Sequence, residues 1–97
     1  MKSARILYVE DDLTLSFVTR DNLERAGYIV ESCDDGVAAY EKITSSDYDL
    51  YILDVMLPKI DGFTLARKIR EKNGAVPILF LSAKSTRDDK IQGLQLG

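Results

Sequence analysis

The sequence predicts an α/β fold in which helices cover both faces of a parallel sheet. Short apolar runs alternate with amphipathic segments along the 97 residues, in the order βαβαβαβα. The connections are short, and no repeat, linker or low-complexity tract interrupts the pattern. Acidic or polar side chains follow three of the apolar runs, at the position where open α/β sheets bind ligands. We therefore expect one small domain with a site at the side of the sheet where the strands end.

The first predicted strand covers residues 4–9 and is followed by Glu10, Asp11 and Asp12. Asp12 is expected to cap the first helix, because Asp just before an apolar helix is a common N-terminal signal. Gly27 ends this helix. Its sheet-facing side is predicted to carry Leu15, Val18, Leu23 and Ala26.

Residues 28–32 form the second predicted strand, which we place near the sheet edge because it is short and polar. Asp34, Asp35 and Gly36 are interpreted as a turn. The second helix follows, with an inner face predicted to carry Ala39, Tyr40 and Ile43.

Residues 50–53 are too short for a free-standing helix and rich in strand formers, so they predict a strand buried on both faces. This strand stops on Asp54. Pro58 disfavours helix at the residue before it, and Asp61 with Gly62 supplies turn chemistry, so a loop is expected after Asp54. The third helix is predicted to pack through Leu65, Ala66 and Ile69 and to end at Asn73 and Gly74.

Residues 76–81 are the fourth predicted strand, in which Pro77 is tolerable because it lies at the strand start. A polar loop begins at Ser82, and residues 87–96 are predicted to form the fourth helix.

Composition excludes several classes of function. A net charge of −3 with a pI near 4.8 argues against nucleic-acid binding by this domain itself. The sequence has no histidine and one cysteine, Cys33, which excludes His-based catalysis and makes a structural zinc site improbable. The start of the sequence carries no apolar signal region, so we expect a cytoplasmic protein without a membrane anchor.

Glu10, Asp11, Asp54 and Ser82 each close or follow a strand, so a parallel sheet brings them to one edge. Neighbouring carboxylates repel by about 1 to 4 kcal/mol per pair, so we expect a bound cation. Oxygen ligands without His or Cys favour a hard ion such as Mg²⁺. Asp54 is then the candidate nucleophile toward phosphorus, with the Ser82 hydroxyl as a donor to a phosphoryl oxygen.

Simpler and competing interpretations remain. Ser82 taken alone is an ordinary loop hydroxyl, and Lys59 an ordinary solvated cation. A phosphotransferase or phosphatase that uses aspartyl phosphate commonly has a second acid two residues after the nucleophile, where this chain has Met56. A nucleotide or flavin binder favours a glycine or hydroxyl loop after the first strand, where the acids here repel phosphate.

Three motifs at these separations resemble the receiver domain of two-component response regulators. They are Val9-Glu10-Asp11-Asp12, the stretch from Asp54 to Gly62, and Leu81-Ser82-Ala83-Lys84. The resemblance covers the whole chain and is greatest to regulators that carry a winged-helix DNA-binding domain. It implies a flavodoxin-like doubly wound sheet of order 2-1-3-4.

The resemblance also implies roles for individual residues. Asp54 is the expected phosphoacceptor, receiving a phosphoryl group from a histidine kinase. Asp11, Asp54 and the Met56 carbonyl are expected to bind Mg²⁺ directly, and Glu10 largely through water. Ser82 and the Ala83 backbone amide are expected to contact the phosphoryl group.

Family receivers continue with a fifth strand, a lysine at the end of that strand and a fifth helix, whereas this sequence stops at Gly97. We therefore expect residues 1–97 to be a C-terminally incomplete receiver domain of a longer protein, controlling a transcriptional output. Strand four is expected to form an apolar edge that supports a homodimer or strand exchange. The alternative function is a protein-interaction module that keeps the receiver fold without being phosphorylated.

Overall fold

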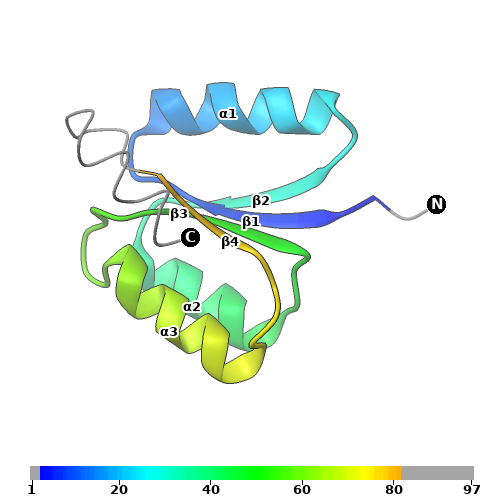
Figure 1. Cartoon of the computed structure of the whole chain (residues 1–97). Coiled ribbons are helices and arrows are strands. Elements are labelled where there is room, and N and C mark those ends of the chain that lie inside the picture. The colour runs from blue at the N-terminus through cyan, green and yellow to red at the C-terminus, as the bar shows by residue number, and fades with distance from the viewer. Residues whose placement is uncertain (1–2, 82–97) are drawn as a thin grey trace.

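A computed structural model describes residues 3–81, in which four parallel strands form one sheet with helices on both faces (Figure 1). The strand order is β2-β1-β3-β4, which confirms the predicted fold class and order. In chain order the elements are β1 (Arg5–Val9), α1 (Leu13–Arg25), β2 (Ile29–Cys33), α2 (Gly36–Ser45), β3 (Leu50–Asp54), α3 (Gly62–Lys72) and β4 (Ile78–Leu81). The predicted helix at 87–96 lies outside the described residues.

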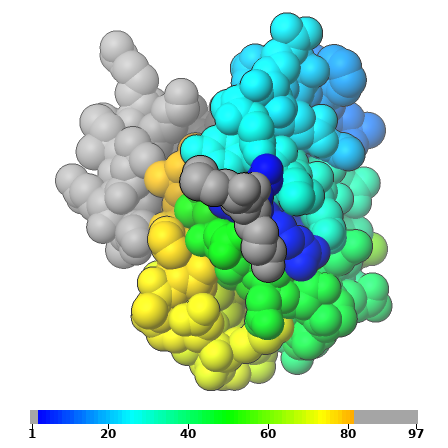
Figure 2. All heavy atoms as spheres, turned by 90° about the vertical axis from the view of Figure 1, so that its right-hand side faces the viewer, coloured from blue at the N-terminus to red at the C-terminus, as the bar shows by residue number. Residues whose placement is uncertain are grey.

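The sheet separates two apolar cores, because successive side chains of a strand point to opposite faces. Leu7 and Val9 of β1 lie in the larger core, which α2 and α3 cover. Ile6 and Tyr8 lie in the smaller core on the α1 side. Figure 2 looks onto the edge where the strands begin, with α1 above the sheet and α3 below it. The acidic residues lie at the opposite edge, where the strands end.

Helix α1 packs less deeply than predicted. None of its residues is buried, and only Leu15 and Leu23 of the predicted face are half-buried. Val18 is 49% exposed, and Ala26 is an exposed residue that caps the helix end. The described part of the sheet meets α1 mainly along β1 and β2, so only a narrow stripe of the helix reaches it. Asp12 does cap α1, accepting a hydrogen bond from the Leu15 amide at 3.0 Å.

Helix α2 corrects two predictions. Asp35 is its N-cap and Gly36 its first residue, so the predicted turn is the helix start. Tyr40 was expected on the inner face but is 37% exposed, whereas Ala39 and Ile43 are buried. Ala39 and Ile43 are four residues apart and therefore lie above one another on the helix, which leaves Tyr40 to one side.

Three strands begin later than predicted, β1 at Arg5 and β2 at Ile29 by one residue and β4 at Ile78 by two. At β4 the reason is chemical, because Pro77 has no N–H to donate to the sheet. Its carbonyl still accepts the Tyr51 amide at 3.1 Å. Helix α3 matches its prediction, with Leu65 and Ile69 buried and Ala66 half-buried.

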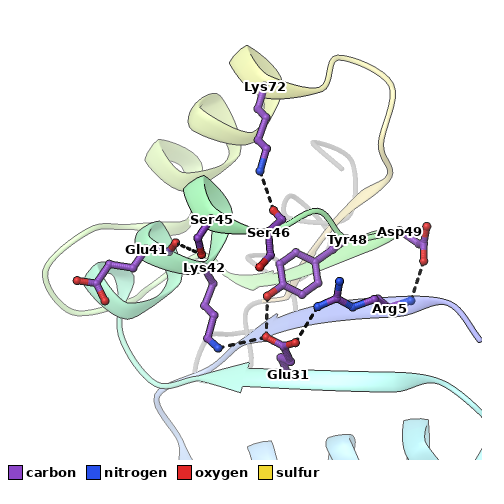
Figure 3. Close-up of polar contacts among 9 residues, drawn as sticks. All are labelled: Arg5, Glu31, Glu41, Lys42, Ser45, Ser46, Tyr48, Asp49 and Lys72. Carbon is purple, nitrogen blue, oxygen red and sulfur yellow. Dashed lines mark hydrogen bonds and ion pairs between the residues drawn. The ribbon is translucent and has the colours of Figure 1, made fainter.

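A polar network on the α2 side of β2 joins three elements through Glu31 (Figure 3). The Tyr48 hydroxyl donates to Glu31 Oε1 at 2.7 Å, and Arg5 Nη2 donates to Oε2 at 2.9 Å. The Lys42 ammonium lies 3.2 Å from Oε1. The hydrogen bond from Tyr48 and the two cations lower the pKa of Glu31 to about 2. The network fixes the segment before β3 against β1 and β2.

Lys72, the last residue of α3, stabilises the end of α2. Its ammonium donates to the carbonyl oxygens of Ile43 at 2.6 Å and Ser46 at 2.7 Å, the latter visible in Figure 3. Carbonyl groups at the last turn of a helix have no partner within the helix, so a cation there satisfies them. Within residues 3–81 no helix is both long and apolar enough to cross a membrane.

Candidate functional site

Three carboxylates meet at the edge of the sheet where β1 and β3 end. Glu10 and Asp11 directly follow β1, and Asp54 is the last residue of β3. The two strands pair in parallel with Val9 opposite Leu53, so the residues that follow them emerge side by side. Each carboxylate offers an oxygen within 4.8 Å of the others. The structure thus brings together the three acids that the sequence predicted to share a site.

Two of these acids are almost completely shielded from water. Glu10 is 0% exposed and Asp54 is 1% exposed, while Asp11 is half-buried. One oxygen of each buried acid accepts a backbone hydrogen bond: Glu10 Oε2 from the Asp12 amide at 3.1 Å, and Asp54 Oδ1 from the Met56 amide at 3.0 Å. Glu10 Oε1 and Asp54 Oδ2 are buried and accept no hydrogen bond from the described residues.

The electrostatics of the site favour a cation. The pKa of Glu10 is raised to about 7, above all by burial and further by the neighbouring Asp54 and Asp11, against a lowering by the Asp12 amide. A buried carboxylate oxygen without a donor is costly unless a proton or a cation neutralises it. Three carboxylates with no nitrogen or sulfur ligand suit a hard divalent ion such as Mg²⁺. The residues present therefore fit the predicted magnesium site.

Two predicted contacts of the site fall on Ser82 and Ala83, which lie outside the described residues. The strand before them is in register with the site: Leu81 pairs with Asp54, and the Val55 amide donates to the Leu81 carbonyl at 2.9 Å. The roles of Ser82 and Ala83 stay predictions, as does metal binding by the Met56 carbonyl. Met56 itself is exposed, and its amide contacts Asp54.

Sequence reasoning missed the close packing behind Asp54. A Cβ atom on Gly62 would lie 2.3 Å from the Asp54 carbonyl oxygen, so only glycine fits there. The Gly62 amide also donates to the Val55 carbonyl at 3.2 Å. The Asp61-Gly62 pair predicts a turn at this position but does not predict the contact with Asp54. The first residue of α3 is therefore packed directly against the backbone of the central acid.

Comparison with known proteins gives a consistent result. Residues 6–97 match the family described as the response regulator receiver domain. The chain is 43% identical over 93 residues to the transcriptional regulatory protein RprY of Bacteroides fragilis, covering 96% of this chain and 39% of RprY. It is 42% identical over 93 residues to the alkaline phosphatase synthesis transcriptional regulatory protein PhoP of Bacillus subtilis, with the same coverage. The chain thus spans about two fifths of the length of these relatives.

A solved structure shares the fold and has a metal ion. The receiver domain of sensor histidine kinase PA1611 from Pseudomonas aeruginosa superposes with a TM-score of 0.82 at 33% identity, covering 99% of this chain and 80% of that domain. That structure contains a magnesium ion coordinated in its active-site cleft.

Proposed function

Because this chain belongs to the response regulator receiver domain family, we propose that it is a phosphorylatable signalling switch with Asp54 as the phosphoacceptor. The single observation that carries the proposal is the Asp54 carboxylate. Its Oδ1 is held by the Met56 amide, and its buried Oδ2 accepts no hydrogen bond from the described residues. One carboxylate oxygen is thus oriented and the other is available for bond formation.

The proposed reaction transfers a phosphoryl group from a phosphohistidine of a cognate histidine kinase. An Asp54 oxygen attacks phosphorus, the P–N bond breaks, and its electron pair stays on the imidazole nitrogen, which takes up a proton. The product is an aspartyl phosphate. The kinase supplies the phosphoryl group, and Asp54 of this chain accepts and keeps it. The chain is therefore a module that modifies itself, and it is not a turnover enzyme.

Glu10, Asp11 and Asp54 would hold Mg²⁺, together with the Met56 carbonyl. When bound, the ion offsets the negative charge shared by these carboxylates and the phosphoryl oxygens. Glu10 would act largely through water.

The Ser82 hydroxyl and the Ala83 amide would contact the added phosphoryl group, because they directly follow the residue that pairs with Asp54. A new charge of about −1.5 to −2 at this edge would shift the end of β4 between two states. We propose that this shift controls a DNA-binding output domain of the parent protein, since RprY and PhoP are transcriptional regulators. Such a regulator acts in the cytoplasm, and its acidic receiver would not bind nucleic acid.

For residues 1–97 taken as a fragment, we also propose that β4 mediates association between two copies, because the fifth strand expected of family receivers would otherwise cover this edge. In the described sheet β4 is an edge strand, and its Leu79 is 36% exposed on the α1 side. Unpaired backbone groups at an apolar edge tend to pair with another chain. Size-exclusion chromatography with light scattering should detect a dimer that Leu79→Lys weakens. A strictly monomeric protein at high micromolar concentration would exclude this association.

The test of the main proposal is chemical labelling. The protein is incubated with MgCl₂ and acetyl phosphate, and intact mass and peptide mapping locate the added phosphoryl group. Asp54→Asn should abolish the label. Asp34→Asn is the matched control, because Asp34 is an exposed acid that follows β2 at the same edge. Labelling at another residue, or none, would reject phosphoacceptor function and favour an unphosphorylated interaction module.

A further inference from the structure

The loop after β3 contains a strained turn. Lys59 has a φ of 72°, the one positive φ at a non-glycine residue in the described part of the chain. The Ile60 amide donates to the Pro58 carbonyl at 2.9 Å, which closes a three-residue turn around Lys59. A γ-turn with positive φ at its centre is rare and strained, and it persists only where surrounding contacts over-determine it.

The contacts that hold this turn come from the start of α2. The Gly36 amide donates to the same Pro58 carbonyl at 3.3 Å. The backbones are so close that a Cβ on Gly36 would lie 2.2 Å from the Ile60 carbonyl oxygen. Asp35 Oδ2 also pairs with the Lys59 ammonium at 3.4 Å. Because that ion pair is exposed and weak, the backbone contact is the main restraint.

The same loop carries the groups that orient the nucleophile. At one end the Met56 amide donates to Asp54 Oδ1, and at the other the Gly62 amide donates to the Val55 carbonyl. The loop is therefore held at two places, by Gly36 against its tip and by Gly62 against its base. A displacement of the tip is transmitted over few residues to the amide that orients Asp54.

We propose that Gly36 is a positioning residue for the acidic site, with a weaker contribution from Asp35. They hold the strained turn at Lys59 and thereby fix the Met56 amide on the Asp54 carboxylate. Neither residue touches the reacting atoms. The close approach of the Ile60 backbone explains why α2 begins with a glycine. The expected effect on Mg²⁺ affinity rests on the proposed function, whereas the restraint on the turn does not.

The direct test is Gly36→Ala, followed by ¹H–¹⁵N NMR during titration with MgCl₂ alone. We expect the Met56 amide resonance to shift before any metal is added, and Mg²⁺ to bind about 10-fold more weakly, as for other residues that orient ligands. Gly74→Ala is the control, because a Cβ on Gly74 meets no atom within 4 Å. An unchanged Met56 resonance in Gly36→Ala, with Mg²⁺ affinity within twofold of the control, would overturn the proposal.

A second pair of variants tests the strain even if Gly36→Ala does not fold. At ordinary positions alanine is more stable than glycine, but at positive φ the order reverses. Lys59→Gly should therefore melt a few degrees above Lys59→Ala, both lacking the ammonium. The opposite order would contradict the strained turn.

Hydrogen exchange in the unmodified protein without metal completes the test. If Gly36 holds the turn, the Gly36 and Ile60 amides should open together and show similar protection. Free exchange at Ile60 beside a protected Gly36 would refute the coupling. This result does not depend on phosphorylation or metal binding, so failure of the proposed function and failure of this inference are distinguishable.

Discussion

Replacing Glu31 with Gln should destabilise the fold through loss of one charge. The change keeps the size of the side chain and the acceptor for the Tyr48 hydroxyl, but leaves Arg5 and Lys42 without their anion. The shift of the Glu31 pKa from 4.5 to about 2 corresponds to about 3 kcal/mol, since one pKa unit is about 1.4 kcal/mol. The side chain is 33% exposed, so solvent screening reduces the expected loss to about 1–2 kcal/mol.

Burial has the largest effect on the pKa of Tyr48 and raises it. The same hydrogen bond to Glu31 raises this pKa further. The two pKa shifts describe one interaction and are not added. Because the pKa of Glu31 is lowered in the folded state, its stabilisation is present above about pH 4.5 and disappears as the pH falls toward 2. The difference between the two proteins should therefore shrink on acidification.

Urea unfolding at pH 7 and near pH 3 measures this difference. At pH 7 the urea midpoint of Glu31→Gln should fall by about 1–2 M, since the urea dependence for a domain of this size is about 1 kcal/mol/M. Glu24→Gln is the matched control, because Glu24 pairs with Arg20 on the exposed face of α1 and should cost less than about 0.5 kcal/mol. Equal stability at pH 7, or a loss that persists unchanged at pH 3, would refute the reasoning.

Three further predictions concern the acidic site and the helices. In EDTA the protein should lose about 1–3 kcal/mol of stability as the pH rises from about 4.5 to about 7, because the raised pKa of Glu10 makes the folded state hold its proton more tightly than the unfolded chain. Glu10→Gln should flatten this dependence on pH, and an unaltered dependence would contradict the assignment. Gly62→Ala should cost about 2 kcal/mol or more in urea unfolding, because its Cβ would meet the Asp54 carbonyl oxygen, and a neutral result would rule out that contact. Lys72→Met should lower the free energy of unfolding by about 1–2 kcal/mol and speed amide exchange at the end of α2, because the Lys72 ammonium donates to two carbonyl oxygens there. Lys68→Met is the reference, because Lys68 does not make these contacts.

Much of the fold was predictable because local chemistry and burial agree along the chain. The apolar run before Asp54 has strand formers on both faces, and the structure buries it between two cores. Asp12 precedes a helix and caps it. The errors fall where a local pattern is ambiguous: Asp35 and Gly36 have the composition of a turn, yet tertiary contact makes them a helix start. Tyr40 fits an apolar pattern but lies beside the buried stripe.

The sequence by itself determined which residues could form the site. Acids directly after strands must share an edge once the strands are parallel, so Glu10, Asp11 and Asp54 were predictable as a cluster. Only the tertiary structure decided how closely they are shielded, which of their oxygens receive backbone hydrogen bonds, and which residues support them. The contacts of Gly36 and Gly62 depend on backbone segments that approach one another through folding, and no local sequence pattern encodes such a distance.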